Sequence, residues 1–237
     1  MKLLLVIILM LSSMVATADI VFLLDKNAAF RQGHIAVLIG SEFKGWHYIS
    51  INGTQTGSKP WGVNFNADTG AVLMDSNGKK ISNLRLAIHS ACVVNPLRNH
   101  NYGLFRRLQT SSSEDLKILS EVKKIAESWI YGVFGPGNSC IDVAQKAFST
   151  LVKLRCLDKN GSVPGKTDLI PKNWFRKIDN RIKSANKRSK NNKIRFYRPL
   201  NKKNKIFFHG KNWLDMTKII KPSKAKKDKM PLVVRVK

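Results

Sequence analysis

The strongest constraint on the fold is a pair of short apolar segments in the N-terminal half of the chain. Residues 34–40 (HIAVLIG) form a continuous apolar run behind Gly33, a pattern that predicts a buried strand. Residues 46–51 (WHYISI) alternate in the manner of a second strand, and SEFKG between them predicts a turn. The two strands are close enough to form a hairpin. Further strands are expected at residues 19–24, 71–75, 82–94 and 102–109.

Two helices are predicted in the region that follows these strands. Ser111 and Glu114 have capping-box spacing, and apolar residues follow with helical period: Leu116, Leu119, Val122, Ile125, Ala126 and Trp129. After the tight loop GPGNS, residues 140–154 predict a second helix, with a buried stripe of Ile141, Ala144, Phe148 and Leu151. Strands followed by helices in this order predict an α+β fold, with an antiparallel sheet packed against helices.

The N-terminus has the pattern of a secretory signal peptide. Lys2 precedes an apolar run over residues 3–11, and Ala16-Thr17-Ala18 supplies a small-residue cleavage site. We therefore expect residues 1–18 to be removed near Ala18 and the mature chain to be exported, periplasmic or secreted, without a transmembrane segment. The alternative is an uncleaved membrane anchor, but the apolar run is short and is broken by Ser12 and Ser13.

Positive charge is concentrated toward the C-terminus. The net charge is +27, and residues 172–237 carry 23 Lys and Arg against 3 Asp and Glu, whereas residues 19–171 carry 18 against 12. This shift predicts a body at residues 19–178 and a basic extension at residues 179–237. Such an extension would bind an anionic surface such as phospholipid, lipopolysaccharide, teichoic acid or nucleic acid. A general compositional bias toward lysine would produce the same pattern.

Cys140 is the residue most suited to chemistry. It follows the GPGNS loop and opens a predicted helix, where unpaired N–H groups and the helix dipole favour a thiolate and could hold an oxyanion. We therefore expect the pKa of Cys140 to lie below the usual range of a thiol. A cysteine nucleophile also needs a histidine within hydrogen-bond reach. His34 is the expected partner, if its strand packs against the start of this helix.

The segments "GHIAVLIG", "GWHYIS" and "NSCIDVAQKAF" together resemble the circularly permuted papain-like hydrolases, relatives of NlpC-type peptidoglycan peptidases and of lecithin:retinol acyltransferase in which histidine precedes cysteine. The resemblance covers residues 30–178 and is greater to exported bacterial members. It is carried by Gly45, Trp46, Tyr48, Ser50, Asn138, Cys140 and Asp142. Ser139 and Ile141 depart from the family pattern. The resemblance implies a permuted papain-like fold with Cys140 as the nucleophile and His34 as the general base and acid.

Relatives also place a polar residue that orients the histidine on the next strand. His47 lies near the expected spacing, and the pleat of the strand decides whether His47, Tyr48 or Ser50 faces the site. Trp46 could line a groove next to His34. Asn138 could contact substrate but is a better candidate for a helix cap. We expect structural or exposed roles for His89, His100 and His209, and core positions for Trp61, Trp129, Trp174 and Trp213.

No cofactor or metal is implied, because the three cysteines fit no zinc pattern. Cys92 and Cys156 are expected either to form a disulfide or to be buried as thiols. The sequence therefore predicts an exported cysteine amidase or peptidase that cleaves peptidoglycan peptides. Two alternatives stay open: a lipid-directed acyl hydrolase or transferase that uses the same cysteine and histidine, and a non-enzymatic protein that binds anionic surfaces through its basic extension.

Overall fold

The structure is a computed structural model that describes residues 17–29, 31–54, 61–94, 100–127, 130–132, 137–155, 168–189 and 193–196. Several predictions from the sequence lie outside these residues. They concern residues 1–16 of the expected signal peptide, residues 197–237 of the basic extension, and Trp129, Cys156, His209 and Trp213. No helix within the described ranges is long and apolar enough to cross a membrane.

The centre of the fold is a six-stranded antiparallel sheet in the order β5-β1-β2-β3-β4-β6. Its strands are β1 (Thr17–Asp25), β2 (His34–Ser41), β3 (Gly45–Thr54), β4 (Trp61–Val72), β5 (Leu104–Ser111) and β6 (Ile130–Gly132). The predicted hairpin is confirmed, because Leu38 of β2 pairs with Tyr48 of β3. The sheet and the helices around it form an α+β fold, as the sequence predicts.

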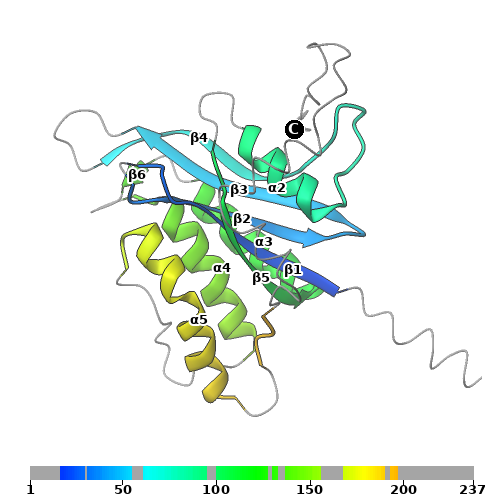
Figure 1. Ribbon diagram of the computed structural model, residues 1–237, viewed down its shortest axis with the longest axis vertical. Coiled ribbons are helices and arrows are strands. Elements are labelled where there is room, and N and C mark those ends of the chain that lie inside the picture. Colours follow the sequence, from blue (N-terminus) through cyan, green and yellow to red (C-terminus); the bar gives the residue numbers. More distant parts are fainter. Residues whose placement is uncertain are drawn as a thin grey trace, which may run out of the picture.

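The sheet is covered on both faces (Figure 1). Alternate residues of β2 point to opposite sides, so Ile35 and Val37 pack in a large core with the helices α3 (Ser112–Ala126), α4 (Cys140–Leu154) and α5 (Pro171–Lys187). Ala36 and Leu38 pack in a second core with α2 (Leu84–Val93). A central strand that is apolar on both faces explains the unbroken run HIAVLIG.

The strand expected at residues 82–94 is wrong, because this segment forms the helix α2. The side chain of Asn83 accepts hydrogen bonds from the backbone N–H groups of Arg85 and Leu86 and thereby caps the helix. Ala87, Ile88 and Ala91 are buried and lie three and four residues apart, which is helical spacing. The strand expected at residues 71–75 also stops early, since β4 ends at Val72 and Met74 forms only an isolated bridge.

The helices α3 and α4 confirm the predicted periodicity. Ser111 and Glu114 form the capping box of α3, with the Ser111 N–H donating to Glu114 Oε2 over 2.7 Å. Leu116 is the exception, because it is 69% exposed while Ile118 is fully buried. The buried face of α3 begins at Asp115 and continues through Ile118, so Leu116 points away from the core.

The body of the protein extends beyond the boundary predicted after Ile178. That boundary falls within α5, whose buried residues are Pro171, Trp174, Phe175, Ile178, Arg181, Ile182 and Ala185. Ile194 is also buried, and Phe196 forms a β-bridge with Leu108 of β5. The last turns of α5, up to Lys187, lie within the expected basic extension. The folded body therefore reaches at least Phe196.

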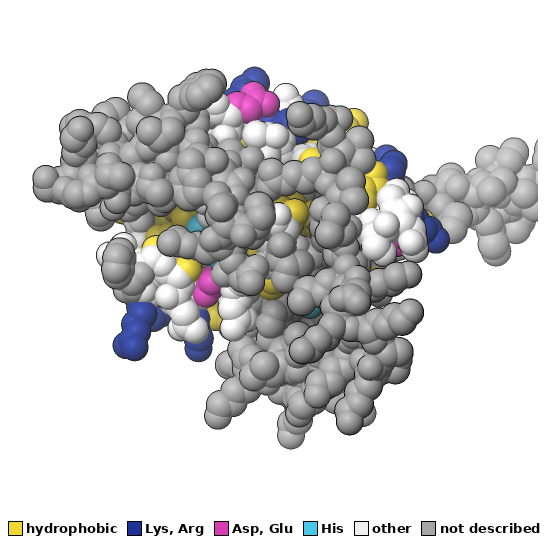
Figure 2. Space-filling view, turned by 90° about the horizontal axis from the view of Figure 1, so that it is seen from above, with side chains coloured by type: hydrophobic (Ala, Val, Ile, Leu, Met, Phe, Trp, Pro, Cys, Tyr) yellow, Lys and Arg dark blue, Asp and Glu magenta, His cyan; other side chains and the backbone are white. Residues whose placement is uncertain are grey.

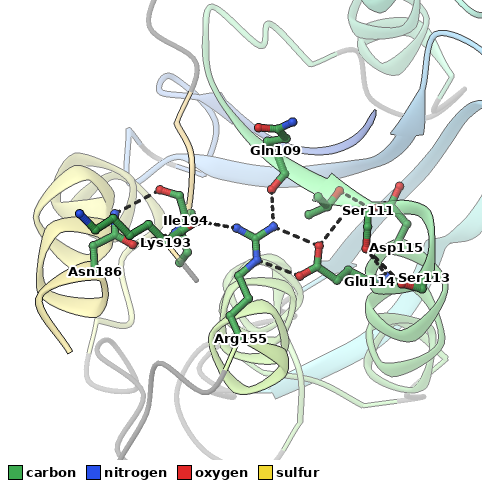
Figure 3. Close-up of polar contacts among 10 residues, drawn as sticks. Gln109, Ser111, Ser113, Glu114, Asp115, Arg155, Asn186, Lys193 and Ile194 are labelled. Atoms are coloured by element: carbon green, nitrogen blue, oxygen red, sulfur yellow. Dashed lines mark hydrogen bonds and ion pairs between the residues drawn. The ribbon is translucent and has the colours of Figure 1, made fainter. Parts of the chain in front are cut away.

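Arg155, directly after α4, ties the segment 193–196 to the body (Figure 3). Its guanidinium donates to Glu114 Oε1 over 2.8 Å, to the Gln109 carbonyl over 2.8 Å and to the Lys193 carbonyl over 2.9 Å. Asn186 of α5 exchanges two further hydrogen bonds with the backbone of Ile194. These bonds connect α3, α4, α5 and β5 to a segment that has no regular structure of its own.

Candidate active site

His34 begins β2 and follows a tightly turned loop. Ala29, Arg31 and Gly33 all have positive φ angles, of 49°, 67° and 95°, a conformation that costs free energy for residues other than glycine. A Cβ atom at Gly33 would lie 3.1 Å from Leu24 Cδ1 and 3.3 Å from the backbone nitrogen of Lys172. Glycine is therefore required directly before His34, and the loop fixes where this histidine starts the strand.

Ser50, from the neighbouring strand β3, contacts the imidazole of His34. The Ser50 hydroxyl lies 2.9 Å from His34 Nε2, and both side chains are buried. His47 was expected in this role, but it lies on the other face of β3. Its Nδ1 donates to the Gly70 carbonyl over 2.8 Å, and burial lowers its pKa. The alternation of side chains along the strand therefore places Ser50, and not His47, against the imidazole of His34.

His100 forms a second layer of the site, which the sequence did not reveal. Its ring stacks on that of His34 with 4.1 Å between centroids and 6° between planes. His100 Nε2 lies 3.1 Å from Asn52 Oδ1, and His100 Nδ1 lies 3.6 Å from Asp25 Oδ2. His100 was expected to be structural or exposed, and of these two alternatives it is buried, directly against His34.

The sequence spacing gives no sign of this cluster, because its members come together through the order of the strands. β1 pairs with both β2 and β5, so Asp25 pairs with His34 on one side and Leu24 pairs with Leu104 on the other. The segment that contains His100, just before β5, therefore lies next to the end of β1. The sequence contains one signal of this cluster: Asp25 is a polar residue at the end of an apolar strand.

Cys140 is brought to the same end of β2. It is the first residue of α4, which packs on the face of the sheet formed by Ile35 and Val37. The backbone N–H of Ile35, next to His34, lies within hydrogen-bonding range of the Cys140 sulfur. The start of α4 therefore lies next to the start of β2, with the Cys140 sulfur at the backbone of Ile35. The alternation along β2 places the His34 side chain with Ala36 and Leu38 on the α2 face of the sheet, opposite the face on which α4 packs, so the pairing of Cys140 with His34 stays a prediction.

The electrostatic environment of Cys140 differs from the expected one. Burial, the largest cause, and the carboxylate of Asp142 together raise the pKa of Cys140 to about 11, against the opposing effect of the N–H groups of Ile35, Cys140 and Ile141. Asp142 also accepts hydrogen bonds from the Ser139 N–H over 2.7 Å and from the Ser139 hydroxyl over 2.8 Å. The expectation of a low pKa is wrong, because Cys140 is buried, with 5% of the residue exposed, and because an acidic side chain, Asp142, occupies the helix N-terminus.

Trp46 and Asn138 do not have the roles expected of them. Trp46 is fully buried, and its indole N–H donates to the Ser82 carbonyl over 2.8 Å, so it is a core residue without access to a groove. Asn138 is half-buried, and its carbonyl accepts a hydrogen bond from the Gly132 N–H over 3.3 Å. Ser139, rather than Asn138, is the N-cap of α4.

The remaining candidates lie away from this cluster or outside the described ranges. His89 is half-buried on α2, and burial lowers its pKa. Cys92 is buried on α2, but its expected partner Cys156 is not described, so the disulfide stays a prediction. Trp174 is a core residue as predicted, with its ring 5.3 Å from that of Phe22. Among the residues that the structure describes, no three His, Cys, Asp or Glu side chains are grouped to hold a metal.

No protein-family model matches the chain, and neither does any curated protein or solved structure.

Proposed function

We propose that this chain is an exported cysteine hydrolase with a permuted papain-like fold, which cleaves amide bonds in peptidoglycan peptides through Cys140 and His34. One observation carries the proposal: the first residue of α4 and the first strand residues of β2 meet, with the Ile35 N–H at the Cys140 sulfur and Ser50 already bonded to His34. A nucleophile, a base and an orienting group are the parts that acyl transfer requires.

The raised pKa of Cys140 decides the form of the mechanism. The cysteine rests as a neutral thiol, so His34 accepts the thiol proton as the sulfur attacks the substrate carbonyl. Ser50 contacts Nε2 of His34 and would orient the ring during this proton transfer. The backbone N–H groups of the first turn of α4 would stabilise the oxyanion. His34 then returns the proton to the leaving amine, and water hydrolyses the thioester to regenerate the thiol.

The substrate class follows from the expected export and from the resemblance to NlpC-type enzymes. The same cysteine and histidine could instead act on a lipid ester, which is the principal alternative. The basic extension would then serve either enzyme by holding it at an anionic surface. On the described part of the face in Figure 2, Lys and Arg side chains lie in several separate places rather than in one patch.

The test is hydrolysis by full-length mature protein carrying Cys140→Ser or His34→Gln. Purified peptidoglycan and phospholipid vesicles are the two substrates, with products identified by mass spectrometry. We expect new muropeptide termini from the wild type and a loss on the order of 10³-fold or more in either variant. Release of fatty acid alone would favour the lipid alternative.

Two matched controls separate chemistry from packing. Ser149→Ala removes a half-buried hydroxyl on α4, and His89→Gln alters a half-buried histidine on α2; both residues lie outside the site. Both controls should retain most of the activity. Full activity in folded Cys140→Ser protein, or equal losses in the controls, would contradict the proposed roles.

A further inference from the structure

We propose that a cleft beside Arg155 binds a phosphate group carried by a larger polar molecule. This Arg155 cleft has a volume of about 860 Å³ and lies between the start of α3, the end of α4, the end of α5 and the segment 193–196. It is distinct from the candidate active site, because Cys140 and Leu154, which lines the cleft, are at opposite ends of α4. The inference therefore does not depend on the proposed hydrolase activity.

The lining of the Arg155 cleft is strongly cationic. Four basic side chains line it, from Lys117, Arg155, Lys193 and Arg195, against a single carboxylate, that of Glu114. Both oxygens of this carboxylate accept hydrogen bonds from Arg155, over 2.8 Å at Oε1 and 3.0 Å at Oε2. The one negative charge of the cleft is therefore already paired within the protein.

The other three cations have no anionic partner in the part of the chain that the structure describes. Lys117, Lys193 and Arg195 are exposed at the cleft, and none of them forms an ion pair with a described carboxylate. They come from two segments that are far apart in the sequence, so the fold itself gathers these charges around one hollow. Their mutual repulsion becomes attraction when an anion lies between them.

Hydrogen bonds hold the cationic segment in place (Figure 3). The guanidinium of Arg155 donates to the carbonyl of Lys193 over 2.9 Å. Asn186 of α5 accepts from the Ile194 N–H over 2.7 Å and donates to the Ile194 carbonyl over 3.1 Å. The backbone on which two of the free cations stand is thus ordered without a ligand, which lowers the entropic cost of binding one.

The size and polarity of the cleft define the class of ligand. Its volume lies in the range of small-molecule sites and is larger than a free phosphate ion requires. Apart from Leu154 and Ile194, the lining side chains are polar or charged, so an acyl chain would bury little apolar surface there. Three uncompensated cations match the two negative charges of a phosphomonoester better than the single charge of a carboxylate. The phosphomonoester can belong to a soluble molecule or to a lipid headgroup.

Two arms of one experiment distinguish these sources, both with the full-length chain at physiological salt. Calorimetry measures binding of glycerol 3-phosphate, with uncharged glycerol as the control ligand. Sedimentation measures binding to phosphatidylcholine vesicles with and without phosphatidic acid, whose headgroup is the same phosphomonoester. The cleft variant is Lys117→Gln combined with Arg195→Gln. We expect at least about tenfold weaker binding in this variant, because each removed cation takes away a charge-assisted hydrogen bond.

The matched control is Lys79→Gln combined with Lys80→Gln, which removes the same charge from two exposed lysines outside the cleft. Its binding should weaken by no more than about two- to threefold, since salt screens distant charges. A selective loss in the calorimetric arm assigns the site to a soluble molecule, and one confined to the vesicle arm assigns it to a lipid headgroup. Equal effects in the two variants, or no binding in either arm, overturn the proposal.

A measurement on the unaltered chain keeps the proposal testable even if the cleft variant fails to fold. Backbone amide shifts are followed by NMR on addition of glycerol 3-phosphate, or of short-chain phosphatidic acid where only vesicles bind. We expect the largest shifts at residues 111–117 and 193–196, which line the cleft. Shifts confined to other residues would overturn the proposal.

Discussion

Replacing Asp115 with asparagine is expected to stabilise this protein at neutral pH. Asp115 lies in the first turns of α3, is 8% exposed, and accepts a hydrogen bond from the Thr110 hydroxyl over 2.5 Å. Burial raises the pKa of Asp115 to about 8; the Thr110 bond opposes the shift, while the charges of Asp19 and Glu114 add to it. The carboxyl group is therefore protonated in the folded state at pH 7.

The sign and size of the effect follow from proton linkage. An unfolded aspartate releases its proton near pH ~4, so from there up to about pH 8 the folded state holds a proton that the unfolded state has lost. The contribution of Asp115 to stability is complete below pH ~4 and falls as pH rises, by about 1.4 kcal/mol per unit. Between pH 5 and pH 7 the loss amounts to roughly 2–3 kcal/mol.

Urea unfolding at pH 5, 6, 7 and 8 measures this difference. Asp115→Asn keeps an acceptor for Thr110 but has no titrating proton. The free energy of unfolding of the variant minus that of the wild type should therefore increase by about 2 kcal/mol from pH 5 to pH 7. Asp179→Asn, at a partly exposed carboxylate on α5, serves as the control and should show no such trend. Parallel pH dependences for Asp115→Asn and the wild type would refute the reasoning.

In the folded chain iodoacetamide should modify Cys140 slowly at pH 7, with a rate that rises toward pH 11, since burial raises its pKa to about 11; peptide mass spectrometry that located the inflection below pH 8 would contradict this. A chain that ends after Phe196 should unfold as cooperatively as the full protein in circular dichroism, whereas one that ends at Ile178 loses the buried second half of α5 and should not fold. Gly33→Ala should cost about 1–3 kcal/mol in urea unfolding, because it adds strain and a tight contact before His34; an unchanged midpoint would count against the strained loop.

The parts of the fold that the sequence predicts are those encoded locally. The hairpin follows from an apolar run, a turn and an alternating run, and the start of α4 follows from the loop GPGNS before Cys140. The helix α2 was mistaken for a strand because its apolar residues are dense enough to fit either period. The helix α5 is not predicted, because its many basic residues indicate a solvated extension. Its buried residues nevertheless have helical spacing: Trp174, Phe175, Ile178 and Ile182.

The candidate site could be predicted only in part, because burial and long-range pairing decide the rest. His34 and Cys140 were found from their positions at the start of elements. Ser50 can be identified only when the pleat of β3 is known, and His100 only when the pairing of β1 with β5 is known. The direction of the Cys140 pKa depends on how deeply the start of α4 is buried, which the helix dipole alone does not determine.

The position of β1 between β2 and β5 has a consequence for how the chain acquires its structure. Ile20 pairs with Ile39 nearby in sequence but with Leu108 far downstream, so one edge of β1 stays open until β5 has been synthesised. Pairings of such long range slow folding and leave an apolar strand exposed in shorter nascent chains. Until β5 pairs with it, the open edge of β1 is a site at which the chain can aggregate through strand pairing.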